Sequence, residues 1–437
     1  MGRMPNHGLD CFRQKQRDQF FAEAGWIVVR FAEQQLAREP GLCGMLVWMA
    51  IPPVIIVGAG PTGATLALCL TQGGIPVCLI EAAPGDPRLF RGQALMPCGM
   101  EVLAYLGITG IPTQPLSAWE FWLEGRLLFR ADEPMGSPYP CTLIAQAPFL
   151  AQVLERAERT GLVQQRLGIP VRDLLWHGDQ VVGVRLATGE EISGSLVVGA
   201  DGRHSQIRQL GGLPVHFSGT VLEVSWHTLP VASAWQEDNV FCTCIAQNQI
   251  LVVFLGADPE YLNLAWVGRG SLDLEIWIPK VPPALAAHFH QHGHALSPPF
   301  TVRAQAGYCP QWWRPGLLLL GDAAHPMSPV RAQGLTMGLR DVLVAAAHLL
   351  KHWGSPTLDL SSIEQERRPE IRRIQRLQAL EAWQGELLRT QPGIRTSLSQ
   401  LSLLVGSPLR RIWLHRQHTL RHGIAAMPTL PDPRISW

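Results

Sequence analysis

The chain has 437 residues, of which 47% are hydrophobic and 16% are charged. This length and composition predict an ordered globular protein with enough chain for two packed domains around a large core. A formal net charge of +1 argues against the strongly basic surface that nucleic-acid binding normally requires. We therefore expect no nucleic-acid partner.

Neither a transmembrane segment nor a secretory signal is expected. Residues 40–80 carry no charge, but prolines and glycines divide them into pieces shorter than the ~20 apolar residues of a spanning helix. The N-terminus lacks the apolar core of a signal peptide. The nine cysteines form no CxxC pair, which favours scattered thiols in a reducing compartment. We predict a cytoplasmic protein without a metal site, and no feature sets its oligomeric state.

Residues 1–49 form an N-terminal extension ahead of the first expected strand. Residues 17–31 resemble the tail of very-short-patch-repair-type endonucleases, but that family's catalytic acids and lysine are missing. No nuclease activity is expected. The extension is either an added αβα piece, or translation starts at Met49.

The first motif predicts a dinucleotide-phosphate turn. A β-branched strand at 54–57 runs into the sequence Gly58-Ala59-Gly60-Pro61-Thr62-Gly63, then into an apolar helix and a second strand ending at Glu81. Gly58 permits the tight turn, Gly60 lets the backbone approach a pyrophosphate, and Gly63 allows close helix–strand packing. The helix N-terminus attracts the anion, and Glu81 can accept hydrogen bonds from ribose hydroxyls.

Two further stretches each place a carboxylate at the end of an expected strand. Around one bend, residues 196–208 bring together Asp201, Ser205 and Arg208, although an Asp-Gly turn with a serine helix cap would look the same. A second buried strand, 317–320, ends in Gly321-Asp322, and a loop follows from Pro329 to Gly334 and Leu335. Such a carboxylate can bind a ribityl hydroxyl, and a loop that opens a helix presents free amide donors to a flavin edge.

In order, the three stretches resemble the GxGxxG, GADGxxSxxR and GDAAHxxxPxxxQG motifs of the class A flavoprotein monooxygenases. This para-hydroxybenzoate hydroxylase-like family includes salicylate and ubiquinone-pathway hydroxylases. The similarity runs from about residue 51 to 350 and implies FAD as cofactor, with NAD(P)H as co-substrate. It implies cofactor contacts at Gly58, Gly60, Pro61, Thr62, Gly63, Glu81, Arg91, Gln146, Asp201, Arg208, Gly321, Asp322, Pro329, Gly334 and Leu335. Of these, Arg91 would otherwise be a solvated loop arginine.

The resemblance also implies the fold: an α/β protein whose Rossmann-like FAD-binding domain carries an inserted mixed-sheet substrate domain and a C-terminal helical region. We expect the FAD-binding domain at 50–212 and 306–350, the substrate domain at 213–305 and the helical region at 351–437. The arginine-rich helices of 361–423 most simply present a solvated face. A weak peripheral membrane contact is the alternative, because basic amphipathic helices also lie on lipid surfaces.

The expected function is an NAD(P)H-dependent monooxygenase that hydroxylates or epoxidises a small apolar substrate, aromatic or polyene, with oxygen. Arg331 and Ala332 stand where the family commonly has two glycines, and Thr336 stands where asparagine is usual. These departures keep two alternatives open: a geranylgeranyl reductase-like enzyme that saturates double bonds, and a catalytically degenerate FAD-binding regulator or scaffold. No catalytic residue is assigned, and His325 is expected to be structural.

Overall fold

The computed structural model describes residues 52–84, 94–231, 238–353 and 358–430. The N-terminal extension, the alternative start at Met49 and the candidate cofactor residue Arg91 lie outside these ranges.

The sheet that carries the three motifs has six strands in the order β18-β19-β12-β1-β2-β8. Its strands are β1 (Val54–Val57), β2 (Val77–Glu81), β8 (Val163–Leu167), β12 (Leu196–Gly199), β18 (Trp313–Arg314) and β19 (Leu317–Leu319). All neighbours pair in parallel except β18, which is an antiparallel edge strand. The central strands are apolar at nearly every position because both faces of the sheet are covered.

Helices cover one face of this sheet, and a small sheet covers the other. The helices are α4 (Pro61–Gln72), α5 (Pro97–Tyr105), α6 (Gln146–Glu158) and α10 (Gln333–His352), while the short α7 (Gln206–Leu210) follows β12. Helix α4 packs between α6 and α10. The covering sheet consists of β9 (Val171–His177), β10 (Gln180–Leu186) and β11 (Glu191–Ser193). A second small sheet joins β3 (Ala94–Leu95), β7 (Thr142–Ile144) and β4 (Thr113–Pro115).

A larger sheet of seven strands has the order β17-β13-β16-β15-β14-β5-β6. Its strands are β5 (Ala118–Leu123), β6 (Arg126–Asp132), β13 (His216–Pro230), β14 (Val240–Ala246), β15 (Gln249–Leu255), β16 (Tyr261–Val267) and β17 (Phe300–Tyr308). Its outer face packs under α8 (Leu274–Trp277) and α9 (Pro283–His292), through Trp266, Trp277 and Phe289. Its inner face contributes Trp119 and Phe254 to the core shared with the cofactor sheet.

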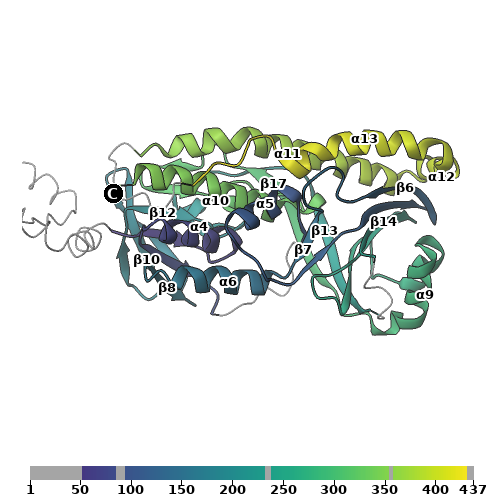
Figure 1. The fold of residues 1–437 in the computed structure, drawn as a ribbon, viewed down its shortest axis with the longest axis horizontal. Helices are drawn as coiled ribbons and strands as arrows, with labels where there is room; N and C mark the ends of the chain where they lie inside the picture. The colour runs from purple at the N-terminus through teal and green to yellow at the C-terminus, as the bar shows by residue number, and fades with distance from the viewer. Residues whose placement is uncertain (1–51, 85–93, 232–237, 354–357, 431–437) are drawn as a thin grey trace, which may run out of the picture.

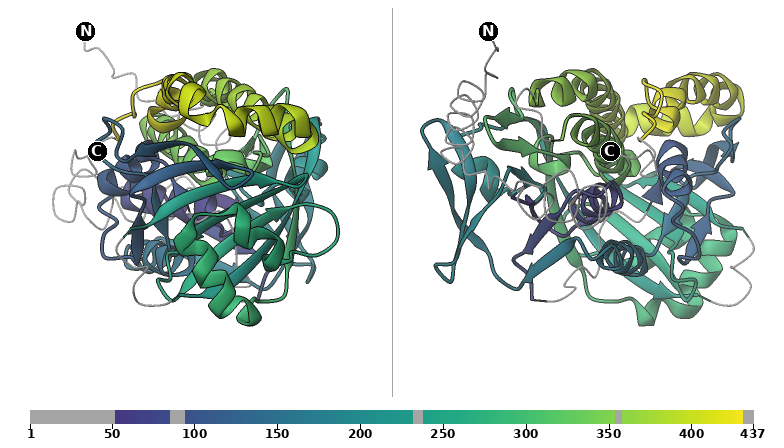
Figure 2. Two further views of the ribbon diagram at one scale, coloured as in Figure 1. Left: turned by 90° about the vertical axis from the view of Figure 1, so that its right-hand side faces the viewer. Right: turned by 60° about the vertical axis from the view of Figure 1, so that its left-hand side comes forward.

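Three helices complete the chain: α11 (Leu360–Thr390), α12 (Pro392–Gln400) and α13 (Ser402–His422). Figures 1 and 2 show them along one side of the molecule, with α13 above β6 and on the opposite side of the seven-stranded sheet from α9. The expected α/β architecture with a C-terminal helical region is confirmed. The larger sheet also takes β5 and β6 from the 50–212 interval. The expected domain limits stay predictions.

Candidate functional site

The glycine turn after β1 has the geometry that the sequence predicts. Gly58 has a φ of +103°, and a Cβ there would lie 2.5 Å from the Ala200 carbonyl oxygen. A Cβ on Gly63 would collide with the carbonyl oxygen of Gly58. In contrast, a Cβ on Gly60 would meet no protein atom within 4 Å. Gly58 and Gly63 are therefore required by the fold, whereas Gly60 leaves open the space beside the turn.

The surroundings of this turn suit the pyrophosphate of a dinucleotide. Pro61 occupies the first turn of α4, and no side chain caps the helix or places a negative charge in that turn. The free amides and the helix dipole can therefore act on an anion. Glu81 lies at the same place: its Oε2 accepts a hydrogen bond from the Ala59 amide at 2.8 Å, and its Oε1 accepts one from the Ala83 amide at 3.0 Å.

The second motif forms an Asp-Gly turn followed by a serine-capped helix, the alternative that the sequence analysis gives for this stretch. The Asp201 carboxylate accepts hydrogen bonds from the Ser205 hydroxyl at 2.5 Å and from the Gln206 amide at 2.7 Å. Ser205 in turn caps α7 by accepting a bond from the Arg208 amide at 2.9 Å. Burial raises the pKa of Asp201, although these donated bonds oppose the shift. In the structure Asp201 therefore shapes the turn between β12 and α7.

The three motifs meet at one place. The first touches the second at Gly58, where a Cβ would lie 2.9 Å from Asp201 Cα. The second touches the third through Arg203, whose Nη2 lies 3.3 Å from Asp322 Oδ2. The third touches the first at Gly321, where a Cβ would lie 2.8 Å from Thr62 Oγ1. These separated stretches thus line a single site.

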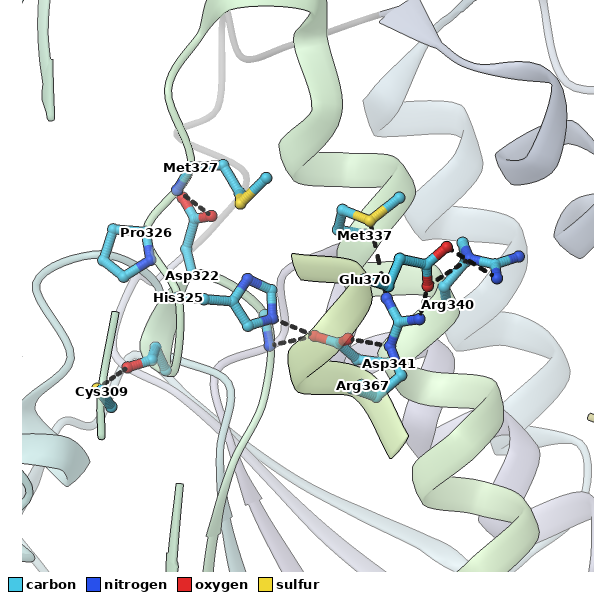
Figure 3. Close-up of polar contacts among 12 residues, drawn as sticks. Cys309, Asp322, His325, Pro326, Met327, Met337, Arg340, Asp341, Arg367 and Glu370 are labelled. Carbon is cyan, nitrogen blue, oxygen red and sulfur yellow. Dashed lines mark hydrogen bonds and ion pairs between the residues drawn. The ribbon is translucent and has the colours of Figure 1, made fainter. Parts of the chain in front are cut away.

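Asp322 lies at the centre of the third motif. Its Oδ1 accepts a hydrogen bond from the Met327 amide at 3.3 Å (Figure 3). The start of α10 lies beside it, because a Cβ on Gly334 would come 3.7 Å from the same oxygen. The buried Arg208 supports this turn from below, donating to the Ala323 carbonyl at 2.9 Å. Asp322 remains about a quarter exposed, so its carboxylate is accessible to a ligand hydroxyl.

A buried ionic network holds the Gly321–His325 turn from behind, as Figure 3 shows. Asp341 of α10 accepts hydrogen bonds from the Gly321 amide at 3.1 Å and from His325 Nε2 at 2.6 Å. Its other oxygen pairs with Arg367 Nε of α11 at 2.7 Å. Burial alone would raise the pKa of Asp341, but the charges of His325 and Arg367 outweigh it and lower the pKa to about 2. Glu370 extends the network by pairing with Arg367 and with Arg340.

The loop where the sequence departs from the family has an unusual backbone. Arg331 has a φ of 62° and Ala332 a φ of 47°, in the left-handed region that glycine adopts most easily. Helix α11 holds the loop in this form. Its Gln378 side chain donates hydrogen bonds to the carbonyls of Ser328 at 2.9 Å and Val330 at 2.6 Å. The missing glycines are therefore replaced by tertiary contacts.

The Arg331 side chain makes further contacts that hold the loop. Its guanidinium lies over three rings, with centroid distances of 4.9 Å to Trp119, 5.4 Å to Phe121 and 4.7 Å to Trp413. Its Nε also pairs with Glu381 Oε2 at 2.5 Å, and both side chains are at least nine-tenths buried. We call these five residues the Arg331 clamp. It joins the loop to the seven-stranded sheet through Trp119 and Phe121, and to the C-terminal helices through Trp413 and Glu381.

Aromatic side chains continue from the clamp across the inner face of the seven-stranded sheet. Trp119 on β5 contacts Phe241 on β14, with ring centroids 4.5 Å apart. Phe241 stacks on Phe254 of β15 at 5.0 Å, and Phe254 meets Trp226 of β13 edge-on at 6.2 Å. This aromatic row contributes to the core that also contains Ala323 and Met327 of the third motif.

The remaining predicted residues lie at the margins of this site. Gln146 is the first residue of α6, and within the described residues no hydrogen bond joins it to the three motif turns. Pro329 precedes the short turn before α10, and Leu335 packs on the core of the cofactor sheet. Thr336, the other departure, is buried, and its hydroxyl accepts a hydrogen bond from the Met96 amide at 3.1 Å.

Sequence reasoning missed the residues that support the site. Asp341 and Arg340 interrupt an otherwise apolar helix, and charges inside an apolar helix must find buried partners. The sequence alone therefore indicates that Asp341 and Arg340 have buried partners. It does not indicate the Arg331 clamp, because the partners of Arg331 come from β5, α11 and α13.

Two further findings concern only the residues that the structure describes. It contains no helix long and apolar enough to cross a membrane. Nor does it contain a group of three or more His, Cys, Asp or Glu side chains arranged to hold a metal ion.

Comparison with known proteins defines the class. Residues 52–378 match the FAD binding domain family, and the chain belongs to that family. It is an FAD-dependent oxidoreductase of the class A monooxygenase type, as the three motifs predict.

Its relatives are hydroxylases and monooxygenases. The chain is 31% identical over 357 residues to a 6-methylpretetramide 4-monooxygenase of Streptomyces rimosus, covering 75% of this chain and 83% of that protein. It is 29% identical over 323 residues to the 3-demethoxyubiquinol 3-hydroxylase of Escherichia coli, covering 66% and 77%. Among solved structures, p-nitrophenol 4-monooxygenase from Pseudomonas putida superposes with a TM-score of 0.69 at 18% identity, covering 86% and 99%, and so shares the fold.

Proposed function

We propose that this enzyme uses NAD(P)H and oxygen to hydroxylate or epoxidise a small apolar substrate, most simply an aromatic one. The observation that carries the substrate class is the aromatic row Trp119–Phe241–Phe254–Trp226, which runs across the inner sheet face beside the third motif. Aromatic side chains offer flat apolar surfaces on which a ring can stack. The hydroxylases and monooxygenases among the relatives support the reaction class.

The described residues divide the work of holding FAD. The open space at Gly60 and the uncapped start of α4 fit the pyrophosphate. Asp322, whose carboxylate is about a quarter exposed, would hold a ribityl hydroxyl, and the free amides at the start of α10 would be available to the flavin ring. Bound FAD supplies the hydride acceptance and the oxygen activation. The protein positions the ring and excludes water from the aromatic side of the site.

Arg331 bears on the reaction through position, not through contact with a substrate. Its guanidinium is enclosed by the clamp and paired with Glu381, so its charge is already compensated. The clamp fixes the loop that precedes the α10 amides. A rigid loop keeps those donors aimed at one place, which is what stabilisation of a charged reduced ring requires.

The decisive experiment is turnover of candidate aromatic substrates under isotopically labelled oxygen, with mass analysis of the product. One labelled oxygen atom per product molecule is the expected result. A product that gains two hydrogens without label, formed equally well under nitrogen, would show a reductase of double bonds instead. FAD binding without turnover of any substrate, in a protein that also fails to oxidise NADH or NADPH, would show the regulatory alternative.

The proposal includes a cytoplasmic location with a small molecule and oxygen as partners. The seven cysteines in the described ranges are all buried and unpaired, which is typical of a reducing compartment. Fractionation of the source cells tests the location.

A further inference from the structure

The hairpin of α12 and α13 exposes apolar side chains on its outward face. Leu403 is 97% exposed, Leu404 is 74% exposed and Leu401 is 48% exposed. Ile394 on α12 and Ile412 on α13 are also exposed. Large contiguous apolar exposure is uncommon on proteins that work free in solution and marks a surface that meets something else.

These side chains are not needed to dock the hairpin on the protein. Leu398, Val405 and Leu409 face inward and pack against the small cluster of Leu123, Leu128 and Ile245. The backbone of α13 also approaches β6 closely, because a Cβ on Gly406 would collide with the Leu128 carbonyl oxygen. The hairpin is thus apolar on two faces, and only the inner one is used by the fold.

The charge of the same segment is one-sided. Residues 391–430 contain no aspartate or glutamate and five arginines. Arg395 and Arg421 are buried and pair with Glu124, which follows β5, and with Glu133, which follows β6. Arg410 and Arg411 are exposed, and within the described residues no ion pair engages either of them.

On α11, where the sequence suggested a basic face, one large apolar side chain is exposed, Trp383 at 60%. Arg367 is buried in the network behind the site, and Arg372, Arg373 and Arg376 are exposed. The stretch of α11 that carries them, residues 365–379, exposes no large apolar side chain. The arginine-rich stretch of α11 therefore presents the solvated face that was expected, and the larger group of exposed apolar side chains lies on the hairpin.

We propose that the outward face of the α12–α13 hairpin docks on a bilayer containing anionic phospholipid. Leu403 and Leu404 would enter the acyl boundary while Arg410 and Arg411 meet the lipid phosphates. Interfacial helices bind in this way, through buried apolar area together with attraction to anionic headgroups. A symmetric contact with a second copy is disfavoured, because it would bring the acid-free faces together and place the arginines of both copies side by side.

The experiment is flotation of the full-length holoenzyme with vesicles of phosphatidylcholine alone and of phosphatidylcholine mixed with phosphatidylglycerol. We expect binding to the mixed vesicles that weakens as salt rises. The double variant Leu403→Ser/Leu404→Ser should bind about tenfold more weakly or worse. Arg410→Gln/Arg411→Gln should lose the preference for the anionic lipid. Neither variant should change FAD content, because these residues lie outside the cofactor motifs.

Matched controls make the outcome specific. Arg372→Gln/Arg373→Gln removes the same charge from α11, and Leu167→Ser removes an exposed leucine from β8; both should float like the wild type. The proposal is overturned if the wild type ignores the mixed vesicles, or if the leucine variant binds them equally well. It is also overturned if gel filtration shows a dimer that the leucine variant converts to a monomer, since a second copy then covers the face.

Discussion

The first and third cofactor motifs follow the ends of parallel strands in one sheet, yet they are held in place in different ways. The turn Gly58–Gly63 is shaped mainly by backbone, because two of its glycines lie where a side chain would strike a carbonyl oxygen, and Glu81 adds one bond to the Ala59 amide. The region from Gly321 to Gly334 is shaped by side chains from distant helices. Asp341, Gln378 and Glu381 each bind it from a position several turns along α10 or α11.

The difference teaches how a glycine-poor loop can be tolerated. Where close approach is the constraint, as at Gly63, no other residue can replace glycine. Where a left-handed φ is the constraint, as at Arg331 and Ala332, the cost is roughly 1–2 kcal/mol per residue, and contacts elsewhere can offset it. The Arg331 clamp supplies such contacts, because a desolvated cation–π pair contributes about 2 kcal/mol.

The largest effect is expected from breaking the side-chain support of the third motif. Asp341→Asn should lower the free energy of unfolding by about 3–5 kcal/mol, because it leaves Arg367 buried beside a neutral amide. Chemical denaturation of the FAD-free protein measures it. Asp359→Asn, which removes an exposed acid at the start of α11, is the control and should cost little, because asparagine caps a helix about as well as aspartate. A loss equal to that of the control would mean that the network does not support the fold.

The Asp341 carboxylate also predicts that stability depends on acid pH. Its pKa is lowered from 3.8 to about 2, so the stability it contributes is present above pH 4 and is lost as the pH falls toward 2. The loss is on the order of 2 kcal/mol. Denaturation series between pH 5 and pH 2 should therefore show a smaller decline for Asp341→Asn than for the wild type. Parallel declines would contradict the assigned shift.

Substitutions at two glycines of the first motif should distinguish a role in folding from a role in cofactor binding. Gly63→Val should cost about 3 kcal/mol or more in stability, because its side chain collides with the Gly58 carbonyl. Gly60→Val should fold normally, since its φ of −69° suits any residue and nothing lies within 4 Å of its Cβ. It should nevertheless lose FAD, because the valine enters the expected place of the pyrophosphate. Melting temperature reports the fold, and flavin absorbance after gel filtration reports the cofactor. Full flavin content in Gly60→Val would place the pyrophosphate elsewhere.

Within the third motif, Asp322 and Arg331 should also differ. Asp322→Ala should weaken FAD binding by about 1 kcal/mol, or about fivefold in Kd, because it removes a direct hydrogen bond. Arg331→Ala should change the Kd less and should chiefly alter the rate of flavin reoxidation, measured by stopped flow. Equal losses of FAD would show that Arg331 binds the cofactor.

The smallest effect is expected at Ala332. Ala332→Gly should raise stability by roughly 1 kcal/mol or less, because it relieves the left-handed φ of 47° without removing a contact of the clamp. Arg331→Gly relieves the same kind of strain but removes the clamp, so it should be neutral or destabilising. Thermal unfolding of the two variants checks this. Stabilisation by both substitutions would mean that the clamp contributes nothing.

Much of the fold could be predicted because its signals are local. The β-branched run at 54–57 and the leucine run at 317–320 both form strands close to their expected bounds. The meeting of the three motifs followed from their common place at strand ends. The support of the third motif did not, because Arg331 and its partners are separated by 50 to more than 200 positions and follow no periodic pattern.

The parallel pairing of β5 with β14 has a consequence for recombining this enzyme with its relatives. Two strands of the larger sheet come from residues 118–132 and five from residues 216–308. A chimera cut only before β13 and after β17 would join five strands of one parent to β5 and β6 of the other, across the register Val240–Ala118 to Ile245–Leu123. It would also divide the aromatic row, because Trp119 would come from one parent and Phe241 from the other. Recombination that keeps this sheet and the aromatic row intact must therefore move both segments together.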